Sequence, residues 1–141
     1  MRFMIIVKST PDFEAETTPP APDEKLMVAM ADFHEELSRA GVLLDASGLQ
    51  PSRKGWRIHY EGGKRTVVDG PFAESKELIS GFTTIQVRSR EEALQWSRRY
   101  PNPVGEGQPA VIEVRQLYEL DDFMPSEQVG RFREMNTPSQ K

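Results

Sequence analysis

The order of hydrophobic and polar positions predicts a chain in which strands and helices alternate. A continuous apolar run at 3–7 predicts a first strand that is covered on both faces. Apolar residues at helical spacing predict a helix from Asp23 to Ala40, and Gly41 suits its C-terminal cap. Between these elements, Ser9 to Pro22 contains four prolines and predicts an exposed loop that could border a cleft.

The rest of the chain repeats this arrangement around a hairpin. Short apolar or alternating runs predict further strands at 42–49, 55–60, 65–68, 82–87 and 110–118. The turn 61–64 joins two of them into a hairpin. Ser89 to Glu92 fits a capping box that opens a second helix, and Pro101 ends it, with Ala93, Trp96 and Tyr100 facing inward.

The order strand-helix-strand, hairpin, strand-helix-strand is the split βαβ pattern of a ferredoxin-like α+β fold with an inserted β-hairpin. Its two helices can cover only one face of the sheet. The simplest cover for the other face is a second copy, which gives a homodimer with a barrel-like core, a dimeric α/β-barrel. We expect residues 1–123 to form this domain. Residues 124–141 are expected to form a weakly ordered arm or a short helix around 126–135 that Val129 and Phe132 pack onto the partner.

Composition narrows the classes of function. The chain has 141 residues, no cysteine, and 18 basic against 22 acidic residues, a net charge of −4. These values exclude thiolate chemistry and give no reason to expect a nucleic acid partner. The N-terminal apolar run is too short for a signal peptide or a membrane span, so the expected location is cytoplasmic, with no membrane partner. Neither a metal site nor a cofactor is expected, because no metal-ligand spacing, phosphate loop or dinucleotide fingerprint occurs.

The stretch from Val67 to Glu77 is the most informative one. Asp69 leaves a β-branched run and is followed by Gly70, Pro71 and Phe72. A carboxylate at a strand end can be held still while it faces a cleft, which suits an acid or base. Asp at the start of a turn can equally accept backbone N–H groups, which is a structural role.

Two histidines are the titrating groups near neutral pH. His34 falls at the edge of the apolar stripe of the first helix. It either bonds to a backbone carbonyl or a neighbouring acid, or it pairs with Asp69 and moves a proton. His59 shares a strand face with Arg57. This face is either simply exposed, or Arg57 binds a substrate carboxylate with His59 beside it.

Three further residues complete the candidate ligand-binding set beside Arg57 and His59. Phe72 belongs to the Asp-Gly-Pro-Phe motif, and Glu74 and Lys76 follow it in the same turn. These side chains could line the mouth of a site at the hairpin. A solvated turn explains Glu74 and Lys76 as well, and Phe72 could belong to a core or an interface.

The motif, together with several other segments, resembles the YCII-related, or DGPF-domain, family of small bacterial proteins. The matching segments are 2–7, 35–37, 40–44, 48–51, 63–72 and 111–115, and the likeness runs from Met1 to about Phe123. The resemblance implies a ferredoxin-like α+β domain that pairs into a dimer. It also implies an activity that is unassigned for most members.

The short YciI branch of this family implies a His-Asp dyad, but neither position is kept here. The helical position that matches lies near Met30, and the segment after the second helix is Tyr100-Pro101-Asn102-Pro103. His34 lies one turn later and does not inherit the role. Asp69 is therefore the functional candidate that the family motif matches most directly.

Two classes of function remain open at this point. The first is a cofactor-free enzyme or binder of a small polar or aromatic acid, in which Asp69 and His34 exchange a proton and Arg57 fixes the anion. The expected architecture is similar to that of muconolactone isomerases. The second is a non-enzymatic regulatory or ligand-binding module associated with transcription, since family members frequently occur beside extracytoplasmic-function sigma factors.

Overall fold

A four-stranded antiparallel sheet forms the centre of the computed structural model, which describes residues 1–15 and 23–136. The strands lie in the order β2-β5-β1-β6. Their bounds are Arg2–Lys8 for β1, Leu43–Gly48 for β2, Ile79–Gln86 for β5 and Ile112–Gln116 for β6. The predicted α+β class is confirmed, and the antiparallel order is consistent with a ferredoxin-like domain.

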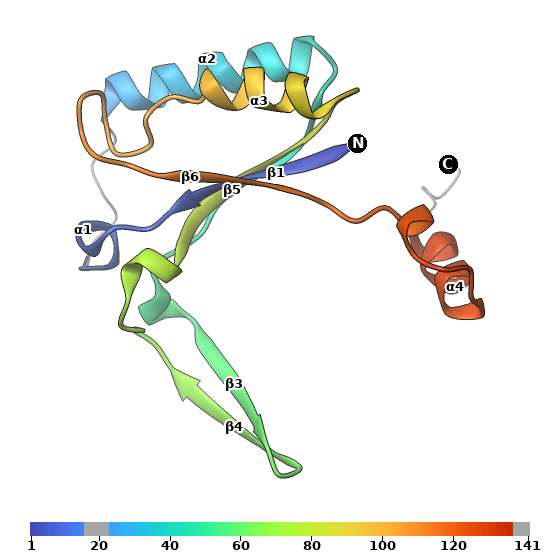
Figure 1. Ribbon diagram of the computed structural model, residues 1–141. Coiled ribbons are helices and arrows are strands. Elements are labelled where there is room, and N and C mark those ends of the chain that lie inside the picture. The colour runs from blue at the N-terminus through green and yellow to red at the C-terminus, as the bar shows by residue number, and fades with distance from the viewer. Residues whose placement is uncertain (16–22, 137–141) are drawn as a thin grey trace.

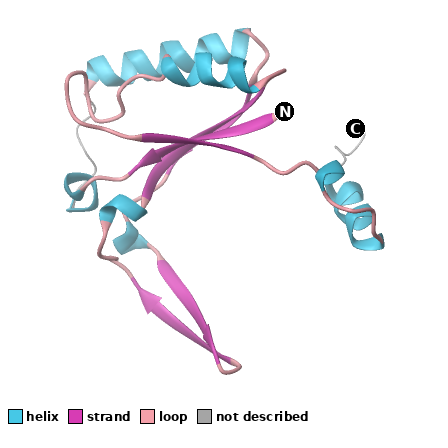
Figure 2. Ribbon diagram, viewed as in Figure 1, coloured by secondary structure: helices cyan, strands magenta, loops and turns pink. Residues whose placement is uncertain are grey.

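Two helices, α2 (Glu24–Arg39) and α3 (Arg90–Arg98), lie together on one face of the sheet (Figures 1 and 2). Asp23 caps α2, because its Oδ1 atom accepts the backbone N–H groups of Lys25 and Leu26 at 3.1 and 3.4 Å. Gly41 follows the helix with a φ of 73°, a left-handed conformation that glycine adopts without strain. The predicted first helix is therefore confirmed at both ends.

The start of α3 differs in one detail from the capping box expected there. Ser89 Oγ accepts the N–H of Glu92 at 3.1 Å, as predicted. The Glu92 carboxylate, however, accepts the N–H of Arg88 at 3.0 Å. In a capping box the Glu92 side chain would bond to the N–H of the N-cap, Ser89. Here it bonds to the residue before the cap instead, and this bond fixes the chain between β5 and α3.

The core lies between the helices and the sheet. Its members are buried apolar residues from β1, β5, both helices and the segments beside them: Phe3, Ile5, Phe33, Leu37, Val42, Ile85, Val87 and Ala93. Trp96 and Tyr100 pack against this cluster while half-buried, in the inward positions predicted for them. Ile5 and Leu37 are fully buried, so this layer supplies much of the hydrophobic stabilisation.

The other face of the sheet is open within one chain. Burial alternates along β1, so Phe3, Ile5 and Val7 are buried, whereas Met4 and Ile6 are only half-buried. The continuous apolar run predicted a strand covered on both sides, and a single chain covers one. Met4 and Ile6 therefore mark a sheet surface on which two layers of side chains could meet.

The predicted hairpin forms a separate two-stranded sheet of β3 (Trp56–Glu61) and β4 (Lys64–Asp69). Figure 1 shows that it projects from the main sheet on the side away from α2 and α3. Two short 3₁₀ helices connect it to the sheet, η1 (Ser52–Lys54) before it and η2 (Ser75–Glu77) after it. The hairpin therefore depends on these connections for its position.

Three further helical segments lie outside the sheet. The short helix α1 (Pro11–Ala15) stands in the segment predicted as loop, of which residues 16–22 lie outside the described part. After β6, the 3₁₀ helix η3 (Leu120–Asp122) leads to α4 (Glu127–Asn136), at the place where a short helix was predicted. No helix in the described part of the chain combines the length and apolar content that crossing a membrane requires.

Candidate functional site

His34 is held between α2 and the sheet by both of its ring nitrogens. Nδ1 lies 2.7 Å from the carbonyl oxygen of Met30, and Nε2 lies 2.8 Å from Oγ1 of Thr83 on β5. A carbonyl oxygen can only accept, so Nδ1 carries the proton and donates it to Met30. In this tautomer Nε2 accepts the hydroxyl proton of Thr83.

Tyr100 packs beside this polar pair. Burial raises the pKa of its phenol above the usual value for tyrosine, and the nearby Thr83 side chain opposes this shift. The Tyr100 ring also packs edge-on against Phe33, with ring centroids 5.3 Å apart, and against His34 at 6.0 Å. Thr83 is 1% exposed, so the centre of the network is shielded from water.

A second polar cluster, centred on Ser52, fixes the Asp-Gly-Pro-Phe motif. The Ser52 hydroxyl accepts the N–H of Phe72 at 3.0 Å and donates to the carboxylate of Glu14 on α1. The same carboxylate accepts the N–H of Ser52 at 2.9 Å. Three segments that are distant in sequence, α1, η1 and the motif turn, are thereby joined at one side chain.

Gly70 is required by this packing. A Cβ atom at this position would collide with the carbonyl oxygen of Ser52. The N–H of Gly70 donates to the carbonyl of Gly55 at 3.0 Å, and the Gly70-Pro71 peptide bond is cis. The glycine and the Phe72 amide of the motif thus act in building the corner between the hairpin and η1.

Arg57 and Phe72 are the two predicted ligand-binding residues that the structure brings into contact. The guanidinium carbon of Arg57 lies 3.9 Å from the centroid of the Phe72 ring, a cation–π arrangement. Arg57 is exposed, and no hydrogen bond or ion pair links its guanidinium to another residue in the part of the chain that the structure describes. The N–H donors of its planar guanidinium group therefore remain available to a ligand.

The strand register separates Asp69 from Arg57. Trp56 pairs with Asp69 and Arg57 pairs with Val68, so the Asp69 side chain shares a hairpin face with Trp56. Arg57 and His59 share the opposite face. A ligand held by Arg57 and His59 would consequently lie across the hairpin from the Asp69 carboxylate.

The remaining two predicted residues lie in the turn after the motif. Glu74 precedes η2 with a φ of 53°, a left-handed conformation that is uncommon for a residue with a side chain. Lys76 lies within η2, and both side chains are exposed. Neither forms a hydrogen bond or ion pair to another residue among those described.

The structure places His34 and Asp69 in separate surroundings. His34 packs under α2 against Thr83, whereas Asp69 is exposed at the end of β4 in the projecting hairpin. No hydrogen bond or ion pair joins the two side chains, and the Asp69 carboxylate has no such partner within residues 1–15 and 23–136. Within one chain, the proton exchange considered from the sequence lacks the required contact.

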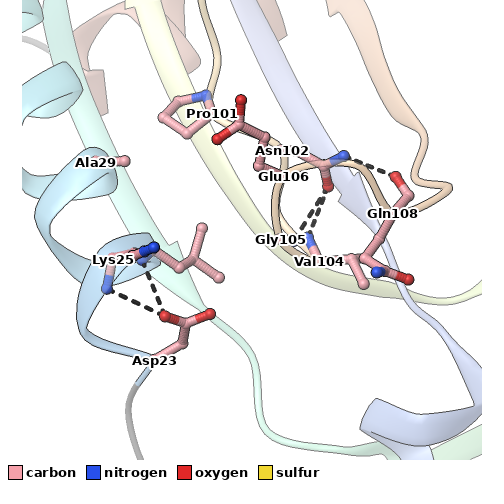
Figure 3. Close-up of a pocket in the computed structure, with 10 residues that line it drawn as sticks. Asp23, Lys25, Ala29, Pro101, Asn102, Val104, Gly105, Glu106 and Gln108 are labelled. Carbon is pink, nitrogen blue, oxygen red and sulfur yellow. Dashed lines mark hydrogen bonds between the residues drawn. The ribbon is translucent and has the colours of Figure 1, made fainter.

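A wide hollow lies away from the motif, between the first turns of α2 and the loop at 101–108 (Figure 3). Its volume is about 980 Å³, and its lining includes Lys25, Leu26, Asn102 and Glu106. Asn102 shapes the loop, because its side chain donates to the carbonyl of Gln108 at 2.7 Å and accepts the N–H of Val104 at 3.0 Å. The hollow is wide and has mixed charge.

Sequence reasoning did not identify this hollow, whereas its smaller neighbour lies beside the segment Ser9 to Pro22, which was expected to border a cleft. A second hollow of about 300 Å³ is lined by Lys8, Asp12 and Phe13, and it shares Val104 with the first. The sequence signals were the turn-forming Asn102 with its flanking prolines and the glycines that follow it. No group of three potential metal ligands gathers in the described part of the chain.

Comparison with known proteins identifies the family. The model of the YCII-related domain matches residues 1–121, most of the chain. The chain is also 34% identical over 80 residues to an uncharacterized protein of Rhizobium meliloti (strain 1021), a match that covers 57% of this chain and 64% of that protein. The chain thus spans slightly less than two thirds of this relative. With the Asp-Gly-Pro-Phe turn and the antiparallel α+β sheet in place, the domain match shows that this chain belongs to the YCII-related family.

Proposed function

We propose that this protein is a homodimeric module that binds a small organic acid at the corner formed by Arg57 and Phe72. The observation that carries the proposal is the guanidinium of Arg57, 3.9 Å above the Phe72 ring and without an ionic partner in the described residues. A planar guanidinium binds a carboxylate through two parallel N–H···O bonds. Phe72 holds the group in place, and its own amide is fixed by Ser52.

The chemistry of this corner favours an aromatic or other flat acid. One face of the guanidinium rests on Phe72, and its other face can stack on a ring of the ligand. His59 lies two residues along the same strand face and can hydrogen-bond to a second polar group of the ligand. Glu74 and Lys76 follow the motif and would lie at the mouth of the site.

Thermal unfolding with a panel of carboxylates tests this binding function. Benzoate should raise the unfolding midpoint of the native protein more than acetate does. Arg57→Gln should abolish this effect, since one bond to a charged group contributes about 1.5–3 kcal/mol, a factor of roughly 10 to 100 in Kd. Arg65→Gln is the matched control, because Arg65 lies on the same hairpin, 5.0 Å from the Tyr60 ring. An equal ligand response in the native protein and Arg57→Gln would exclude the corner.

The dimer is proposed to form through the open face of the sheet, which would complete the α/β-barrel. Support comes from Met4 and Ile6 on β1, which are apolar and only half-buried within one chain. Light scattering after gel filtration should give twice the chain mass of 16.0 kDa. Ile6→Asp should yield monomers, whereas Leu94→Asp on the exposed side of α3 should not. A native protein that elutes as a monomer would refute the dimer.

A second candidate function is a cofactor-free acid–base enzyme that uses Asp69. It is favoured by the exposure of Asp69 at a strand end and by the absence of a partner for its carboxylate among the described residues. His34 is bonded to Thr83 and does not contact Asp69 within one chain, so this candidate rests on the Asp69 carboxylate. NMR monitoring of small organic acids should reveal turnover that Asp69→Asn abolishes. Unchanged turnover in Asp69→Asn would exclude this role.

A regulatory module would use the same bound acid as a signal in the cytoplasm, with a sigma factor as the partner that family context suggests. The expected result is co-elution of the purified protein with a sigma factor of its host, altered when the acid is added. Arg57→Gln should remove the effect of the acid on co-elution. The absence of co-elution with every sigma factor of the host would eliminate this form of the proposal.

A further inference from the structure

We infer that the hairpin of one protomer packs against the C-terminal arm of its partner, so that the dimer is closed by two exchanged contacts. The C-terminal arm is taken here as residues 118–136, which adds residues 118–123 to the described part of the arm expected from the sequence. The apolar hairpin face is defined as the side chains of Trp56, Ile58, Tyr60 and Val67. This inference deepens the homodimer of the proposed function and rests on it.

The apolar hairpin face leaves large apolar side chains exposed to water. In β3 the large side chains alternate, and the register places Val67 of β4 opposite Ile58, so all four side chains lie on one face. Trp56 is 63% exposed, Tyr60 is 68% exposed and Val67 is 62% exposed. A two-stranded hairpin is marginally stable alone, so a covering layer would stabilise it.

The C-terminal arm carries a matching apolar surface. Val129, Phe132 and Met135 follow one another at intervals of three along α4, which places them on one side of the helix. Phe132 is 54% exposed and Met135 is 68% exposed. Within its own chain, the helix is tied to η3 by the ion pair of Arg133 with Asp121, 3.0 Å long. The apolar side of α4 thus has the size and chemistry to cover a hairpin face.

The charges of the two segments are complementary. Residues 52–69 contain five basic and two acidic residues, a net charge of +3. Residues 118–136 contain five acidic and two basic residues, a net charge of −3. The excess comes from Glu119, Asp121 and Asp122 before α4, which is itself neutral, and Glu119 is paired with Arg2. Opposite net charges favour this pairing over hairpin with hairpin or arm with arm, since like charges would repel in both of those contacts.

The arrangement of one chain indicates that the C-terminal arm that covers the hairpin belongs to a second copy of the chain. Figure 1 shows the hairpin and α4 extending from the sheet in different directions, so they do not cover each other within one protomer. The hairpin projects on the side of the sheet away from α2 and α3, where the open face with Ile6 also lies. A partner seated on that open face would therefore lie beside the hairpin.

The chain has no cysteine, so introduced thiols report this contact directly. One chain carries Ile58→Cys, and a second chain with a distinguishable tag carries Phe132→Cys. After subunit exchange, a short bismaleimide should join the two different chains, and neither variant alone should give a covalent dimer. His59→Cys, on the opposite hairpin face, is the matched control and should cross-link to Phe132→Cys much less.

Each outcome separates the exchanged contact from the dimer itself. Proteins that are dimeric by light scattering yet give no cross-link between Ile58→Cys and Phe132→Cys would overturn the inference and leave the dimer intact. Efficient linking of Ile58→Cys chains to each other would overturn it in favour of paired hairpins. Monomers would refute both proposals.

A second pair of variants tests the apolar hairpin face without thiol chemistry. Val67→Asp should increase amide hydrogen exchange in α4, because the substitution places a charge in the proposed contact. Thr66→Asp introduces the same charge one position away on the opposite face and should leave the exchange of α4 unchanged. Equal exchange in α4 for Val67→Asp and the native dimer would contradict the contact.

Discussion

Nε2 of His34 lies 2.8 Å from Oγ1 of Thr83, a residue that is 49 positions away in the chain. This bond ties α2 to the central strand β5 from inside the core. Tyr100, which follows α3, packs edge-on against the His34 ring, with ring centroids 6.0 Å apart. The bond to Thr83 thus connects the helical layer to the sheet, which gives His34 a structural role within the chain.

Replacement of Thr83 with valine should destabilise the protein more than such a small change in side-chain shape suggests. Valine has nearly the same shape, but it leaves Nε2 of His34 without its buried partner. An unpaired buried polar group costs about 1–3 kcal/mol, so urea unfolding should show a loss of that order. Thr84→Val is the matched control, since Thr84 lies next in β5 and is also buried, on the opposite face. Equal losses for both variants would contradict the role of the network.

Stability should fall in alkaline solution because of Tyr100. Burial raises the pKa of its phenol above 10.0, so the folded state holds this proton more tightly than the unfolded chain. The stabilisation is complete below pH 10 and is lost as the pH rises through the pKa of the folded state. The free energy of unfolding, measured between pH 9 and 11, should decline less steeply in Tyr100→Phe. Tyr118→Phe provides the control, because Tyr118 is 74% exposed.

Gly70→Ala should disrupt the motif corner. The new methyl group would meet the carbonyl of Ser52, which is backbone and cannot turn away. We expect a loss of at least about 2 kcal/mol in the free energy of unfolding, together with weaker acid binding at Arg57. Gly130→Ala is a suitable control, because Gly130 lies in α4 with open space around it and alanine favours helices. An equal free energy of unfolding for Gly70→Ala and the native protein would contradict this prediction, because it would mean that the Ser52 backbone moves to make room for the methyl group.

Glu14→Gln should loosen α1 and the hairpin base together. The carboxylate of Glu14 accepts from both the N–H and the hydroxyl of Ser52, and bonds to a charged group contribute about 1.5–3 kcal/mol each. Amide hydrogen exchange at Ser52 and Phe72 should become faster. Glu35→Gln on the exposed side of α2 removes a carboxylate of a surface pair and should leave these amides unchanged. Unaltered exchange at Ser52 and Phe72 in Glu14→Gln would show that the Glu14 carboxylate does not hold α1 to the base of the hairpin.

Local patterns predicted the fold well because its elements depend on short-range rules. Asp23 and Gly41 bound α2 through capping geometry, and the spacing of Phe33 and Leu37 gives its buried side. The helix α1 was missed, because Pro11 and the prolines after it favour a loop. In the structure Glu14 anchors this helix through a contact 38 residues away, which no local pattern contains.

The candidate site was harder to predict, because it depends on contacts between distant segments. The Asp-Gly-Pro-Phe motif was identified from sequence, but the need for Gly70 arises from the backbone of Ser52. The alternation of β3 placed Arg57 and His59 on one face, whereas only the pairing with β4 places Asp69 on the other. Thr83 offered no sequence signal, since its importance comes from the burial of its neighbours.

The hydrogen bonds of Ser52 to Glu14 and Phe72 have a thermodynamic consequence. Glu14 on α1 and Phe72 beside Arg57 are bonded to one residue, so local opening of α1 and of the motif corner share a free energy. A molecule that stabilises the corner therefore also protects α1, whose residues Asp12 and Phe13 line a separate hollow. By linkage, a molecule that stabilised α1 from that hollow would raise the affinity of the corner for its ligand by the same factor, so binding at either surface would be felt at the other.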